Sequence, residues 1–170
     1  MGQVTHDQAN LLLRLYELRR EPRMRQAREW FIRDFSASSM EELFKKYPPG
    51  SEENASFRMV TSYWEMCAGM VNRGLIDDEF FFENGGEAWI VYHKSMEFAV
   101  SQRKGMANPL VLKQLEDLGT RMDAWRDRTA PGFNERIRER FRQFAEAREQ
   151  REKEAAKKGK ARKRGKSRKA

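Results

Sequence analysis

One segment, from Ser51 to Arg73, limits the possible folds of this chain more than any other. On a helical wheel at ~100° per residue its apolar side chains fill an arc of roughly 200°, which is wider than the apolar stripe of a surface helix. These side chains are Phe57, Met59, Val60, Tyr63, Trp64, Met66, Cys67, Ala68, Met70 and Val71. Because other elements must cover so wide an apolar face, the segment is predicted to form the central helix of a bundle.

Capping signals mark where other helices begin. Thr5 is followed three residues later by Gln8, which is the spacing of a capping box. Ser39 and Glu42 repeat this spacing at the start of a short helix that Pro48 must end. The first of these helices carries a predicted apolar stripe of Leu11, Leu15 and Leu18.

Proline and glycine mark further helix boundaries. Pro22 fits the first turn of a second helix. Asn108 and Pro109 predict an N-cap followed by proline at the first position of a later helix. Gly74 fits the left-handed position just after the central helix, with Leu75 folding back as its hydrophobic contact.

These patterns predict a single all-α bundle of about seven helices over residues 5–145. Residues 77–86 are expected to form a short capped helix, because a strand there would lack a partner strand. Glu149 and Lys153, and Glu154 and Lys158, are paired at i,i+4, which predicts a solvated, charged helical extension over residues 146–156. Residues 157–170 contain no apolar residue larger than alanine and are predicted to be disordered.

Glu65 follows Tyr63 and Trp64 on the central helix but lies on its polar side, two turns from Arg58. Three states of this carboxylate are open. It can be exposed or ion-paired at the surface, or it can form a buried ion pair with an arginine from another helix. It can also act as a catalytic acid or base, for which Arg58 and Glu65 would have to line one cleft.

The remaining chemically versatile residues predict neither a metal nor a cofactor. His6 and His93 are the only histidines and lie far apart, without the spacing of metal ligands. Cys67 is the only cysteine, so no intramolecular disulfide forms and a reducing compartment is expected. Because Cys67 falls inside the apolar arc, we expect it to behave as a small hydrophobic side chain.

The central residues also carry a resemblance. Arg58 with the Ser62–Glu65 block, the Gly74–Asp77 block, Phe81–Glu83 and the helix containing Trp89 resemble a family of small bacterial helical proteins of unknown function.

This resemblance covers residues 11–125 and implies a helical domain in the bacterial cytoplasm. It implies no activity and no functional residue. Several relatives carry an N-terminal membrane-anchoring helix ahead of this block, which this sequence does not show. No stretch of the chain approaches the ~18 uninterrupted apolar residues of a transmembrane helix.

Charge is divided unevenly along the sequence. Residues 1–150 hold 23 lysines and arginines against 24 acidic residues, whereas residues 151–170 hold 11 against 2. Such a polycation attracts phosphate backbones by releasing counterions, so nucleic acid, including RNA or ribosomes, is a predicted partner. A merely solvated tail and an anionic membrane surface are the alternatives. The predicted polyanion-binding residues are Lys157, Lys158, Lys160, Arg162, Lys163, Arg164, Lys166, Arg168 and Lys169.

Three functions follow as hypotheses. The first is a non-enzymatic, cytoplasmic interaction or scaffold module that its tail tethers to nucleic acid or another polyanion. The second is an enzyme or small-ligand binder that uses Arg58 and Glu65. The third is a homo-oligomer, assembled through one apolar seam on the last predicted helix: Phe133, Ile137, Phe141 and Phe144.

Overall fold

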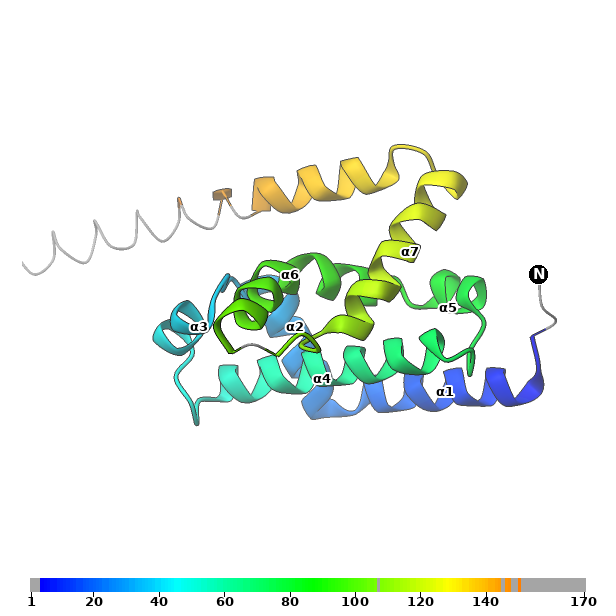
Figure 1. Ribbon diagram of the computed structural model, residues 1–170, viewed down its shortest axis with the longest axis horizontal. Coiled ribbons are helices and arrows are strands. Elements are labelled where there is room, and N and C mark those ends of the chain that lie inside the picture. The colour runs from blue at the N-terminus through cyan, green and yellow to red at the C-terminus, as the bar shows by residue number, and fades with distance from the viewer. Residues whose placement is uncertain (1–3, 107, 145, 148–149, 151–170) are drawn as a thin grey trace, which may run out of the picture. The chain divides into compact units, whose positions relative to one another are not determined.

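The computed structural model describes residues 4–106, 108–144, 146–147 and 150. Within these residues the secondary structure is entirely helical, so the predicted fold class is confirmed. A helix over residues 133–144 follows the seven labelled in Figure 1. The seven are α1 (His6–Arg20), α2 (Pro22–Asp34), α3 (Met40–Lys46), α4 (Glu52–Asn72), α5 (Asp78–Asn84), α6 (Gly86–Met106) and α7 (Lys113–Thr129).

The chain divides into two compact units, Met1–Trp125 and Arg126–Ala170. The boundary falls inside α7, so the predicted domain over residues 5–145 draws on both units. Of the predicted charged extension, residues 146–147 and 150 are helical. The rest of that extension and the predicted tail, residues 157–170, lie outside the described residues.

Side-chain caps begin the helices where the sequence predicts them. The hydroxyl oxygen of Thr5 accepts a hydrogen bond from the backbone N–H of Gln8, and that of Ser39 accepts one from Glu42, both at 3.2 Å. Ser51 caps α4 in the same way, because its hydroxyl oxygen accepts from the backbone N–H of Asn54 at 3.1 Å. Each cap satisfies a backbone donor that the first helical turn leaves without a partner.

The end of α4 agrees with the predicted position of Gly74, although Leu75, predicted to fold back as a hydrophobic contact, is 53% exposed. Gly74 has a φ of +74°, in the left-handed region that glycine adopts without strain. The N–H of Leu75 donates to the carbonyl of Met70 at 3.1 Å, and the N–H of Gly74 donates to that of Val71 at 2.9 Å. These two bonds form a Schellman motif, which turns the chain sharply toward α5.

The predicted start of α7 was wrong. Asn108 is not a helix N-cap, because its side-chain oxygen accepts from the N–H of Leu110 at 3.0 Å and closes a local turn. The turn continues to Leu112, which has a φ of +51°, and the helix begins only at Lys113. Asparagine followed by proline favours such a turn as well as a helix start, and local sequence does not separate the two.

The predicted stripe on α1 was wrong in part. Leu15 is 4% exposed, but Leu18 is 55% exposed. In Figure 1, α1 runs beside α4 at the edge of the first unit, and the hydroxyl of Tyr63 on α4 donates to the carbonyl of Leu15 at 2.6 Å. Because α1 lies at this edge, only part of its apolar surface is covered.

The core is formed where α2 and α6 pack on α4, and α2 makes its most extensive contacts with α4. Four stacked or edge-on phenylalanine rings join these helices. The ring centroids of Phe31 and Phe35 lie 4.6 Å apart, and Phe57 on α4 lies 5.0 Å from Phe35 and 4.9 Å from Phe98 on α6. Such aromatic pairs stabilise a core beyond the area they bury.

The approach of α7 to α6 requires a glycine. A Cβ atom at Gly119 would lie 2.3 Å from the ring of Tyr92. This ring therefore rests directly on the backbone of α7, and no larger residue fits without moving one of the two helices.

We expect Gly119→Ala to lower the free energy of unfolding by about 1–3 kcal/mol, because the added methyl group overpacks the helix contact. Chemical denaturation followed by circular dichroism measures this change. Gly105→Ala on α6 is the matched control, since a Cβ there meets nothing within 4 Å. It should be neutral or stabilising by up to about 1 kcal/mol, as alanine favours helix more than glycine does. Equal effects of the two variants would contradict the proposed contact.

Candidate functional site

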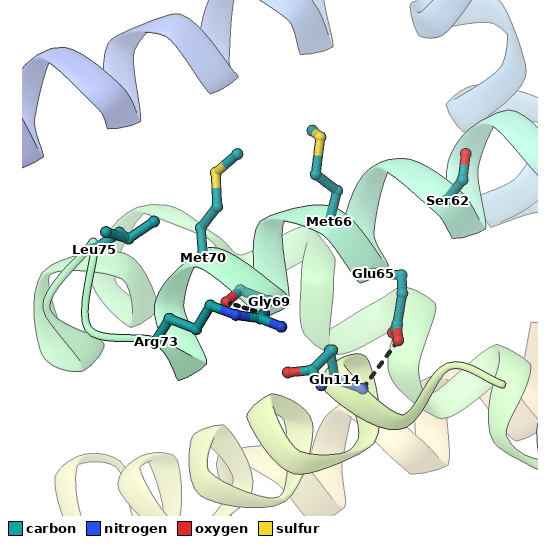
Figure 2. A pocket seen from close by; sticks show the side chains of 8 residues that line it. All are labelled: Ser62, Glu65, Met66, Gly69, Met70, Arg73, Leu75 and Gln114. Atoms are coloured by element: carbon teal, nitrogen blue, oxygen red, sulfur yellow. Dashed lines mark hydrogen bonds between the residues drawn. The ribbon is translucent and has the colours of Figure 1, made fainter. Parts of the chain in front are cut away.

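Glu65 joins α4 to the first turn of α7. Its two carboxylate oxygens accept hydrogen bonds from the backbone N–H groups of Gln114 and Leu115, at 3.0 and 2.8 Å. Figure 2 shows the first of these bonds. The residue before α7 is Leu112, whose side chain has no acceptor. Glu65 supplies the missing cap from another helix, and its negative charge lies at the positive end of the helix dipole.

This arrangement differs from the three predicted states of Glu65. The side chain is half-buried rather than exposed, and its partners are backbone amides rather than an arginine. Arg58 is exposed and does not line the hollow beside Glu65. The structure thus does not bring Arg58 and Glu65 together as an acid or base site.

A second set of polar contacts fastens α7 to α4 and α5. The side-chain nitrogen of Asn72 donates to the backbone and side-chain oxygens of Gln114, at 3.0 and 2.8 Å. The oxygen of the same amide accepts from Arg121 at 3.0 Å. Arg121 also makes a bidentate ion pair with Asp78 on α5, with both distances at 2.9 Å. Asn72 is therefore hydrogen-bonded both to Gln114 at the start of α7 and to Arg121 two turns later.

The residues that carry the resemblance are used to hold helices together. Trp64 is 2% exposed and packs edge-on against Phe81, while Ile76 is fully buried. Asp77 caps α5 by accepting from the N–H of Phe80 at 3.0 Å. The sequence blocks that carry the resemblance therefore contain residues that pack in the core, Trp64 and Ile76, and residues that cap helices, Glu65 and Asp77.

A shallow hollow of about 430 Å³ adjoins Glu65 and is largely apolar. Figure 2 shows Met66 and Met70 pointing to one side of α4, and Glu65 and Arg73 pointing to the side where Gln114 lies. Arg73 donates from Nη1 to the backbone carbonyl of Gly69, one turn earlier on α4, at 2.9 Å. Such a hollow can accept an apolar side chain. The lining is Ser62, Glu65, Met66, Gly69, Met70, Arg73, Leu75 and Gln114.

Residues 4–122 match DUF4760, a domain of unknown function. The chain belongs to this family. No curated protein and no solved structure matches it. The resemblance seen in the sequence is thereby confirmed as membership of a family of unknown function. Among the described helices, none combines the length and the apolar character needed to cross a membrane.

At the C-terminal edge of the DUF4760 match lies a histidine–carboxylate pair that was not predicted from the sequence. Oδ1 of Asp123 on α7 accepts from the indole N–H of Trp89 at 2.5 Å and lies 3.2 Å from Nε2 of His93. Trp89 and His93 are four residues apart on α6, a visible signal for one helix face, but their partner is remote in sequence. In the described parts of the chain, no group of three or more histidine, cysteine, aspartate or glutamate residues could hold a metal.

Cys67 is a structural residue, as the sequence predicted. It is 1% exposed, and burial raises the pKa of its thiol to about 12. Burial also raises the pKa of the neighbouring Tyr63 hydroxyl. Because a raised pKa keeps the thiol protonated at neutral pH, Cys67 is a poor nucleophile.

A part-buried ion pair joins α2 to the start of α6. The guanidinium of Arg28 is bonded to both carboxylate oxygens of Glu87, and the Nε–Oε1 distance is 2.5 Å. Its Nη1 also donates to the carbonyl of Arg19 at 2.8 Å. The hydrogen bonds and negative charge of Glu87 raise the pKa of Arg28, so this arginine remains charged although it is largely buried.

The predicted apolar seam lies beyond the DUF4760 match. Phe133 and Phe144 are 37% and 64% exposed, whereas Ile137 and Phe141 are half-buried. The guanidinium of Arg126 lies 5.5 Å from the Phe133 ring centroid. All nine predicted polyanion-binding residues, Lys157 to Lys169, lie outside the described residues.

We expect Glu65→Ala to lower the free energy of unfolding by about 1–3 kcal/mol, since two backbone N–H groups lose a charged acceptor. Glu65→Gln should lose less, because its amide oxygen still accepts one bond. Glu97→Ala, an exposed position on α6, is the control and should change stability little. If Glu65→Ala were as stable as this control by urea denaturation, the carboxylate would not be the cap that α7 requires.

Proposed function

We propose that this protein is a non-enzymatic helical interaction module whose basic C-terminal segment tethers it to nucleic acid. The observation that carries the proposal is the separation of charge along the chain. The last 20 residues hold 11 lysines and arginines against 2 acidic residues, while the preceding 150 residues are nearly neutral.

Polyelectrolyte physics supports this partner. A segment with nine lysines and arginines among residues 157–169 neutralises several phosphates at once and releases their counterions. This term does not depend on base sequence, so it suits a tether rather than a sequence reader.

The internal use of polar groups supports a non-enzymatic role. Glu65 caps α7, Asp77 caps α5, and Arg121 pairs with Asp78. These groups lie in helix contacts, whereas a catalytic acid or base must reach a substrate. The single buried cysteine and the family resemblance support placing the module in a reducing bacterial cytoplasm.

We expect the full chain to bind a short fluorescein-labelled DNA or RNA duplex in fluorescence anisotropy. Affinity should fall about 10³-fold or more between about 50 and about 200 mM salt if six or more phosphates are contacted. Deleting residues 151–170 should remove most of this salt dependence, because it removes the polycation.

A scrambled segment of the same composition is the matched control and should bind as the natural one does, since counterion release depends on charge density. Binding that survives the deletion unchanged, or that shows no salt dependence, would contradict the tether.

A second candidate function is self-association through the helix over residues 133–144. The specific observation that favours it is Phe144, which is 64% exposed on the same apolar seam as Phe133, Ile137 and Phe141. An exposed aromatic side chain on an apolar seam is typical of a helix that packs against a partner.

For this candidate, light scattering of the full chain should give a mass above that of the monomer. Phe144→Glu should return it to the monomer, because a charge would be buried in the interface. Gln143→Glu adds the same charge at a neighbouring exposed position and should leave the mass unchanged. A monomeric wild-type protein at high concentration would exclude this self-association.

A further inference from the structure

Arginine side chains gather around one exposed tyrosine where α1 meets α2. Tyr16 is 46% exposed, and the guanidinium carbons of Arg19 and Arg20 lie 4.9 and 5.6 Å from its ring centroid. Arg25 reaches back from α2 and donates from Nη2 to the carbonyl of Arg20 at 3.2 Å. We call these four residues the α1–α2 arginine cluster.

The arginines of this cluster form no ion pair within the described part of the chain. No carboxylate there forms an ion pair with Arg19, Arg20 or Arg25, in contrast to Arg28, which is paired with Glu87. Glu21 lies in the same corner, where its carboxylate caps α2 by accepting from the N–H of Met24 at 2.9 Å. This bond leaves its negative charge in place, so Glu21 offsets only one of the three arginine charges. The cluster therefore presents net positive charge to solvent.

The cluster is also partly fixed in position. Two guanidinium groups lie close to an aromatic ring, which attracts cations, and the third is bonded to a backbone carbonyl. Arg25 keeps further N–H donors after that bond, because a guanidinium has five. Planar donors held in this way match the geometry of a phosphate group and lose little entropy on binding it.

The surroundings favour nucleic acid over a lipid surface. A helix that lies in a membrane interface needs a continuous apolar face flanked by cations. The exposed leucines of α1, Leu13 and Leu18, are five residues apart, which places them ~140° apart around the helix. They form no continuous face beside Arg20.

We propose that the α1–α2 arginine cluster is a second phosphate-binding surface, which contacts the backbone of the same nucleic acid that the basic C-terminal segment binds. This inference rests on the proposed function. It adds an ordered contact within the DUF4760 domain to the charge carried by residues 151–170.

The test uses the full chain with the double substitution Arg20→Gln and Arg25→Gln, both at exposed positions. The matched control is Arg14→Gln with Arg33→Gln, which removes two exposed arginines from the same two helices but outside the cluster. Both doubles lower the net charge by two, so a difference between them reports position rather than total charge. Thermal unfolding of each double variant verifies that it is folded.

In the anisotropy salt series, log affinity falls linearly with log salt. The cluster variant should reduce the magnitude of this negative slope by about 2, roughly one unit for each lost phosphate contact. The control should lower it by less than about 1. Equal slopes for the two variants, or a cluster variant that binds as the wild type does, would overturn the inference.

The two proposals fail in different ways. If deletion of residues 151–170 abolishes binding and the cluster variant binds normally, the tether holds and the cluster inference is wrong. If the deletion has no effect but the cluster variant weakens binding, the tether is wrong, and the cluster binds nucleic acid by itself rather than as a second surface beside the C-terminal segment. Vesicles with and without anionic phospholipid form a further arm: loss of vesicle binding by the cluster variant, with nucleic-acid binding intact, would assign the cluster to lipid and overturn the inference.

Discussion

The hydrogen bonds from Glu65 to the first turn of α7 fix the position of a helix whose own N-terminal residue cannot cap it. Leu112 has no side-chain acceptor, so without Glu65 the amides of Gln114 and Leu115 would lack a partner in a half-buried place. Once α7 is docked, Arg121 reaches α5, and the backbone at Gly119 meets the ring of Tyr92. The contacts that α7 makes with α4, α5 and α6 thus include a cap supplied by one carboxylate from the middle of α4.

Local patterns predicted much of the fold. The wide apolar arc predicted that α4 is central, and the hydroxyls of Thr5 and Ser39 begin helices as expected, because a cap is decided within a few residues. The start of α7 and the role of Glu65 were not predictable in this way. Their partners are about 50 residues apart in sequence, and only the packing of two helices brings them together. The exposure of Leu18 likewise depends on the position of α1 at the edge of the first unit, which local sequence does not indicate.

The residues of the candidate site hold helices together and indicate no activity. Two of these residues, Trp64 and Ile76, are buried in the core, and two others, Glu65 and Asp77, cap helices. The hollow beside Glu65 is shallow. The positive charge that could engage a partner lies elsewhere, in the α1–α2 arginine cluster and in the C-terminal segment.

The burial of Cys67 has a practical consequence. Its thiol is enclosed on α4 and stays protonated, so maleimide dyes, spin labels and cellular oxidants have little access to it in the folded protein. A cysteine introduced at an exposed position becomes the one readily labelled sulfur without removal of the native residue. Distances between such a label and a labelled oligonucleotide can then be measured in otherwise unaltered protein.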